Sequence, residues 1–320
     1  MRDGDRDPQH RTGGTGGTAH PGVLALVNAR AGSASRELER ALSALASGAS
    51  ELGGVLEVAR TSSLADLRGV LGRLAGRRLV VLGGDGSLHA AVQALHDAGA
   101  LRAAGPVGVV PMGTGNDLAR TLGLAIGDPP AAVRTALTGT PVDLELLVED
   151  GGGIAVNAVH AGIGVAATQR AERLKPVLRR VAYPVGVLAA GVARPWGVRV
   201  VVDGREVHDG RRPLLMVAAS IGTTIGGGAP VSPTSVPHDG VVDVVVSTAT
   251  GPVARAGYAR TLMRGQHVER RDVAVTRGAD VLLEAVDGRP FALNADGETG
   301  APALRHRWRT LPDAWSVRVP

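Results

Sequence analysis

The chain contains no cysteine. A protein without thiols forms no disulfide bonds, offers no thiolate to a metal ion and has no cysteine nucleophile, which is typical of a reducing compartment. Aromatic residues are also scarce, with three Trp, two Tyr and one Phe among 320 residues. Proteins that bind single-stranded nucleic acid stack the bases on aromatic rings. We therefore expect neither a disulfide-stabilised secreted fold nor a nucleic acid partner.

Lysine and long apolar runs are equally rare. Lys175 is the one lysine, and no Walker A glycine pattern precedes it, which excludes P-loop NTPases. The strand lysine and His-Arg-Asp loop of protein kinases are missing too. The longest apolar candidate, at 185–193, is shorter than the roughly 18 to 20 residues needed to span a bilayer. The sequence therefore predicts no transmembrane helix.

The remaining composition predicts two domains, because single hydrophobic cores stop growing at about 250 to 300 residues. Residues 1–20 have almost nothing to bury, and we expect a disordered tail or a misassigned start. Residues 21–148 alternate strand and helix patterns, typical of a doubly wound, nucleotide-binding α/β domain. Residues 149–304 consist of short β-rich runs and predict a second, antiparallel β-rich domain. The sequence leaves open whether 305–320 returns to the first domain.

One helix boundary in the α/β domain is predicted from a glycine. Leu38, Leu42 and Leu45 recur at helical spacing. Gly48 follows them, and glycine commonly ends a helix. We therefore expect this helix to end at Gly48.

Two glycine-rich turns stand out, GGDGS at 83–87 and GTGND at 113–117, and each follows a short β-branched run. Glycine lets backbone N–H groups turn toward an anion, and a helix that begins there adds its positive end. Both turns follow predicted strands of the same parallel sheet, where ligands bind at the carboxyl ends. Each turn alone is as typical of an ordinary strand-to-helix connection. Together they favour a phosphate site.

Each turn also carries a hydroxyl and a carboxylate. Ser87 and Thr114 are suited to donate hydrogen bonds to phosphate oxygens. Asp85 and Asp117 are suited to hold Mg²⁺, or a water bound to it, next to those phosphates. A third motif, DGE at 296–298, is by itself most typical of a type I′ hairpin turn.

These motifs together resemble the diacylglycerol kinase catalytic domain family, particularly its soluble bacterial lipid kinases. The resemblance runs from about 23 to 320, in the order GGDGS, PMGTGNDLAR and NADGE. It implies an α/β nucleotide domain related to that of NAD kinases, followed by a β-rich lipid domain. Further stretches that support the resemblance lie at 28–33, 157–164, 226–233 and 239–243.

The resemblance implies that ATP, with Mg²⁺, phosphorylates a lipid hydroxyl between the two domains. Asp296 would act as general base on the hydroxyl, although the aspartate that matches Asp85 has also been given that role in the family. Glu298 would lie near the Mg-nucleotide, and Arg120 would face phosphate. Asp239 matches a position that holds a second, structural Mg²⁺ in some members. The residues that would line the nucleotide are Asn28, Gly32, Gly84, Gly86, Ser87, Thr114, Gly115 and Asn116.

Four positions depart from the usual pattern of the family: Ala29, Ser33, Ala90 and Ile221. They motivate a second hypothesis, a nucleotide- or lipid-binding protein without catalysis. A third hypothesis is an NAD kinase, which shares a Gly-Gly-Asp-Gly-Thr turn and a related fold. The second turn, GTGNDLAR, favours the lipid kinase.

The lipid is left open, because diacylglycerol, a sphingoid base and undecaprenol all present a hydroxyl and pocket shape selects among them. A substrate that lies in the bilayer predicts a cytoplasmic protein attached peripherally to the inner face of the membrane. The oligomeric state is also open, a homodimer included.

Overall fold

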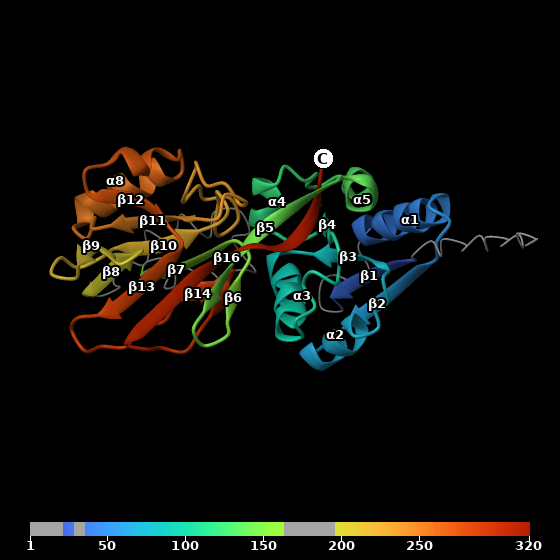
Figure 1. Cartoon of the computed structure of the whole chain (residues 1–320). Helices are drawn as coiled ribbons and strands as arrows, with labels where there is room; N and C mark the ends of the chain where they lie inside the picture. The colour runs from blue at the N-terminus through green and yellow to red at the C-terminus, as the bar shows by residue number, and fades with distance from the viewer. Residues whose placement is uncertain (1–21, 29–35, 163–195) are drawn as a thin grey trace, which may run out of the picture.

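The computed structural model describes residues 22–28, 36–162 and 196–320. Its two halves lie side by side, an α/β half and a β-rich half (Figure 1). The α/β half contains a four-stranded sheet in which all strands run parallel. The strands, in spatial order, are β2 (Leu56–Thr61), β1 (Val23–Asn28), β3 (Arg78–Gly83) and β4 (Gly108–Pro111).

Helices cover both faces of this sheet, because the strands are apolar on both sides. In β1, Ala25 packs in one core cluster and its neighbour Leu26 in the other, as expected for a buried parallel strand. One face is covered by α1 (Arg36–Glu51) and α5 (Pro129–Thr138), and the other by α2 (Leu64–Leu71) and α3 (Asp85–Asp97). The predicted doubly wound α/β domain is confirmed.

The predicted end of α1 at Gly48 is wrong, because the helix continues to Glu51. A Cβ atom on Gly48 would lie 2.4 Å from Cδ1 of Leu137 in α5. This glycine therefore allows two helices to pack closely and does not end one.

Among the described residues, the β-rich half is an antiparallel sandwich of two six-stranded sheets, which confirms the predicted antiparallel β-rich domain. Its core lies between the sheets and includes Phe291 and Trp308. One sheet has the order β12 (Val273–Gly278), β11 (Val242–Ser247), β10 (Met216–Ser220), β7 (Ala158–Gly162), β14 (Asn294–Ala295) and β15 (Glu298–Thr299). The other has the order β6 (Ile154–Ala155), β5 (Thr140–Glu149), β16 (Arg305–Val319), β13 (Asp280–Ala285), β8 (Val198–Val202) and β9 (Arg205–Asp209).

The pair β5 and β16 connects the halves, as Figure 1 shows. Leu147 of β5 and Trp308 of β16 lie in the sandwich core, whereas Leu144 and Trp315 lie in the core of the α/β half. The last residues of β16 also reach the α/β sheet, where Val317 bridges to Val107.

The outer face of the first sandwich sheet is covered by α8 (Pro252–Leu262), whose Tyr258 is fully buried there. Among the helices that the structure describes, none is both long and apolar enough to cross a membrane.

Candidate active site

The two glycine turns meet at the carboxyl ends of β3 and β4. A Cβ atom on Gly84 would lie 2.8 Å from Cα of Gly113, and one on Gly113 would lie 2.5 Å from Cα of Gly84. Real Cβ atoms do not approach backbone so closely, so both positions require glycine. The turns are further joined by the Met112 N–H, which donates to the Gly83 carbonyl at 2.9 Å. The structure therefore brings the two predicted motifs into direct backbone contact.

Some residues of the turns contact the turn backbone, and others are exposed to solvent. Asn116 is 4% exposed, and its side-chain amide bonds both the N–H and the carbonyl of Gly113, at 3.0 and 2.7 Å. Ser87 lies back over Gly83, where a Cβ atom would stand 2.5 Å from the Ser87 Oγ atom. Thr114 and Gly86, by contrast, are exposed at the tips of their turns. Only some of the residues predicted to line the nucleotide are therefore exposed to solvent.

Asp85 is the first residue of α3 and links the two turns. Its Oδ1 accepts the Asp117 N–H at 2.8 Å, and its Oδ2 lies 2.5 Å from where a Cβ of Gly115 would stand. Burial, and then the negative charges of Asp117 and Asp296, raise the pKa of the Asp85 carboxyl to about 6. The site therefore has an excess of negative charge that a bound cation would relieve.

Asp117, at the start of α4 (Asp117–Thr121), ties the turns to the β-rich half. Its carboxylate accepts hydrogen bonds from the Thr224 hydroxyl and from the N–H groups of Gly227 and Gly228, each at 2.8 Å. The side chain is buried, with 5% exposure. Arg120, on the same helix, is exposed and donates to the Gly115 carbonyl at 3.0 Å. Asp117 thus joins the two halves, and both of its carboxylate oxygens accept hydrogen bonds from the β-rich half.

Asp296 is placed by a tight hairpin turn between β14 and β15. Asp296 and Gly297 have φ of 49° and 100°, the left-handed values of a type I′ turn. The hairpin expected from this dipeptide is therefore confirmed. The Asp296 side chain is 0% exposed. Its Oδ1 accepts the N–H groups of Asn157 and Ala158, both at 3.0 Å, and its Oδ2 accepts that of Val156 at 2.7 Å.

His89 completes the surroundings of Asp296. Its Nδ1 lies 2.9 Å from Asp296 Oδ2, and its side chain is 14% exposed. Burial lowers the pKa of His89, but the hydrogen bond and the charge of Asp296, with Glu298, outweigh it and hold that pKa above its usual value. A second histidine, His160 on β7, is 5% exposed, and burial lowers its pKa to about 4.

The other predicted site residues lie around this centre or away from it. Glu298 is exposed in β15, two residues from Asp296. Asn28 is the last residue of β1, at the same edge of the sheet as the glycine turns, and is half-buried. Gly32 lies outside the described residues.

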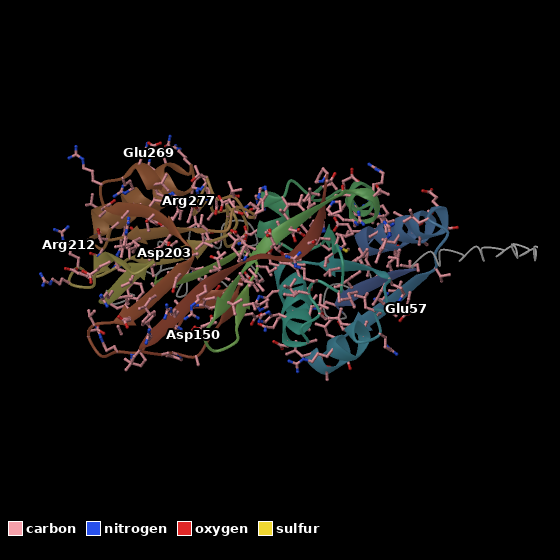
Figure 2. The ribbon with its side chains drawn as sticks, in the orientation of Figure 1. Glu57, Asp150, Asp203, Arg212, Glu269 and Arg277 are labelled. Atoms are coloured by element: carbon pink, nitrogen blue, oxygen red, sulfur yellow. The ribbon has the colours of Figure 1, made fainter. Side chains whose placement is uncertain are left out.

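Asp239 lies in the β-rich half, where Arg277 on β12 already occupies its carboxylate. Arg277 forms ion pairs with Asp239 and with Asp243, the latter at 2.9 Å, and Figure 2 shows Arg277 on that half. Glu145 is fully buried nearby, and its Oε2 accepts the Gly240 N–H at 2.8 Å. Arg277 therefore offsets part of the negative charge of Asp239 and Asp243, and the metal-binding role of Asp239 stays a prediction.

The carboxylates at the glycine turns fit a magnesium ion that arrives with nucleotide. Mg²⁺ bound to substrate phosphates needs only one or two carboxylates and keeps several waters. Asp85 offers one carboxylate where negative charge is in excess, and Glu298, the second carboxylate that the resemblance implies, is exposed. Within 22–28, 36–162 and 196–320, no three Asp, Glu or His side chains converge as a metal site.

Sequence reasoning missed the partners of the site residues. The hydrogen bond between His89 and Asp296 joins residues 207 positions apart in the sequence, and the one between Asp117 and Gly228 joins residues 111 positions apart. The GGG stretch at 226–228 was a signal for the second contact, since a run of glycines indicates close approach of backbone. No local pattern indicated the first.

The chain thus combines a parallel α/β sheet that carries two joined glycine turns with a β-sandwich that contributes the Asp296 carboxylate. Two family models match the chain: residues 22–148 match the diacylglycerol kinase catalytic domain, and residues 157–319 match the YegS C-terminal NAD kinase beta sandwich-like domain. The chain belongs to the diacylglycerol kinase catalytic domain family, a family of lipid kinases.

Individual relatives agree with this membership. A diacylglycerol kinase from Mycobacterium tuberculosis (strain H37Rv) is 30% identical over 251 residues, 76% of each chain. One from Bacillus subtilis (strain 168) is 27% identical over 226 residues, which cover 69% of this chain and 71% of the relative. The crystal structure of a diacylglycerol kinase from Bacillus anthracis (strain Sterne) has a TM-score of 0.74, covering 95% of this chain and 98% of that chain at 19% identity. This last similarity shows a shared fold.

Proposed function

We propose that the protein transfers the γ-phosphoryl group of ATP to the hydroxyl of a lipid of the diacylglycerol type. The observation that carries the proposal is the contact between Gly84 and Gly113, which joins two phosphate-type turns beside Asp85. The charge of Asp296, from the other half of the molecule, raises the pKa of Asp85, which supports a shared site. Family membership supports the reaction class.

Exposed groups of the two turns are suited to hold the phosphates. The Thr114 hydroxyl and the backbone at Gly86 lie at the turn tips, and α3 begins at Asp85 with its positive end toward them. The Arg120 guanidinium, exposed beside Gly115, adds positive charge for the phosphoryl group. Mg²⁺ would be held by Asp85 and Glu298 and would offset phosphate charge.

The acceptor hydroxyl must lose its proton during transfer. We assign this step to the group formed by the buried Asp296 carboxylate and the side chain bonded to it, His89. The charge of Asp296 raises the pKa of Asp85, so this group lies within electrostatic range of the glycine turns. General base catalysis of this kind contributes typically 10²- to 10⁴-fold. Asp117, whose oxygens are bonded to the 226–228 loop, would hold the halves in register.

A lipid acceptor also sets where the protein works. Its hydroxyl lies at the surface of a bilayer, so the protein would attach to the inner face of the cytoplasmic membrane without spanning it. Such attachment is expected to depend on lipid concentration in the assay and to leave the protein extractable by salt or alkaline wash.

The proposal is tested by Mg²⁺-dependent ADP production with a panel of detergent-dispersed lipids, with NAD as an alternative acceptor. NAD is included because the β-sandwich domain matches an NAD kinase-like family. Turnover that requires a lipid hydroxyl supports the proposal. Turnover with NAD alone would assign the protein to the NAD kinases, and ATP binding without any turnover would indicate a binding protein that lacks catalysis.

A further inference from the structure

The Asp296 carboxylate has no oxygen lone pair left for a substrate. An ionised carboxylate offers about four acceptor positions. Three are used by the N–H groups of 156–158 and the fourth by His89, at 2.7 to 3.0 Å. The side chain has no exposed surface. Asp296 is therefore a fixed, buried negative charge, and a hydroxyl cannot bond to it without displacing one of these donors.

His89 has the opposite character, since one ring nitrogen is anchored and the other is free. An ionised carboxylate only accepts hydrogen bonds, so the hydrogen bond to Asp296 places a proton on Nδ1 of the ring. Nε2 of the neutral ring then carries a lone pair. It bonds to none of the residues in the described ranges and is not among their enclosed polar atoms that lack a partner.

The position of His89 puts this nitrogen close to the phosphate turns. His89 follows Asp85 by four residues in α3, so the two side chains lie on one helix face, with Cβ atoms about 5 to 6 Å apart. Asp85 borders both glycine turns. His160 is a poorer candidate, because it is almost fully enclosed in β7 and has no hydrogen bond to Asp296 among those described.

We propose that Nε2 of His89 accepts the proton of the lipid hydroxyl, and that Asp296 is a positioning residue that fixes the ring tautomer and stabilises the imidazolium. This inference rests on the function proposed above. The hydroxyl proton moves to Nε2 as the lipid oxygen forms a bond to the γ-phosphorus. The bond between that phosphorus and the oxygen bridging to the β-phosphate breaks, and ADP leaves with the electron pair. The imidazolium then releases its proton to solvent.

The first test is His89→Asn, which keeps an N–H near the position of Nδ1 and removes the basic nitrogen. We expect kcat with lipid to fall by about 10²- to 10⁴-fold, while KM for ATP and thermal stability change little. His96→Asn, in the last turn of the same helix, is the matched control and should keep full activity. His89→Ala with added imidazole should recover part of the lost kcat, because a diffusible base enters the vacated space.

A second measurement is independent of turnover. The ¹⁵N shifts of the neutral His89 ring in the full-length protein should show the proton on Nδ1, because Asp296 accepts it there. Lipid kinase activity of His89→Asn within about threefold of the wild type would overturn the inference and leave the proposed function standing. A neutral ring protonated on Nε2 would also overturn it. A wild-type protein that phosphorylates no lipid would overturn both proposals.

Discussion

Glu145 offers a sharp test of how the β-rich half is stabilised. Its side chain is fully buried in β5, and Oε1 has no hydrogen-bond partner among the described residues. Burial, and then the charges of Asp239 and Asp243, outweigh the Gly240 N–H and Arg277 and raise its pKa from 4.5 to about 7. The folded protein therefore binds this proton more tightly than the unfolded chain does.

The sign of the pH dependence follows from that difference. The contribution of Glu145 to stability is greatest below pH 4.5 and is lost as the pH rises toward its folded pKa of about 7. Relative to low pH, a pKa raised from 4.5 to about 7 lowers the free energy of unfolding by about 3 kcal/mol at pH 8, where Glu145 is ionised in the folded protein. At pH 5 the same shift lowers it by about 1 kcal/mol. Glu145→Gln removes the charge at every pH. Its free energy of unfolding relative to wild type should therefore rise by about 2 kcal/mol between pH 5 and pH 8.

The assay is urea unfolding of wild type and Glu145→Gln at pH 5, 6.5 and 8, extrapolated to zero denaturant. Any fixed cost of fitting the amide cancels in the change with pH. Glu57→Gln is the control, because Glu57 is half-exposed and surface ion pairs contribute only about 0 to 1 kcal/mol. Figure 2 shows Glu57 at the far end of the molecule from Arg277. A difference between Glu145→Gln and wild type that stays constant from pH 5 to pH 8 would show that the pKa of Glu145 is not raised in the folded protein.

Three further substitutions test the joined glycine turns and the hydrogen bonds of Asp117. Gly113→Ala places a methyl group 2.5 Å from Cα of Gly84, so ATP affinity measured by calorimetry should fall at least about tenfold; unchanged affinity would contradict the phosphate site. Gly69→Ala lies in α2 with open space around it, so it should leave ATP binding intact and raise the free energy of unfolding by up to about 1 kcal/mol, and a loss of stability would mean a hidden contact. Asp117→Asn replaces an acceptor of three hydrogen bonds and should lower the free energy of unfolding, measured in urea, by about 2 to 4 kcal/mol. A variant as stable as wild type would show that these hydrogen bonds contribute nothing to stability.

The fold class and the joined turns were predictable because they leave periodic or compositional signals. Alternating strand and helix patterns up to residue 148 indicated the parallel sheet, and the glycine turns follow β3 and β4, neighbouring strands whose carboxyl ends lie at the same edge of that sheet. The Asp-Gly pair at 296 and 297 likewise indicated its hairpin, since both residues adopt positive φ.

The partners of individual side chains were not predictable, because a single contact between distant residues leaves no pattern. Arg277 reaches Asp239 from 38 positions away, a contact that no local pattern indicated. Gly48 shows a related limit. Its role depends on Leu137 in α5, so the same residue that locally indicates a helix end instead permits close helix packing.

The central claim is that this chain phosphorylates a lipid hydroxyl, and the most direct measurement follows the phosphorus itself. Wild type and Gly113→Ala would be incubated with [γ-³²P]ATP, Mg²⁺ and mixed micelles containing diacylglycerol or other lipid alcohols, and the label in the extracted lipid phase would be counted. We expect Mg²⁺-dependent label in the lipid for the wild type and a severe loss for Gly113→Ala. Label that stays in ATP and inorganic phosphate with every lipid alcohol would contradict this claim.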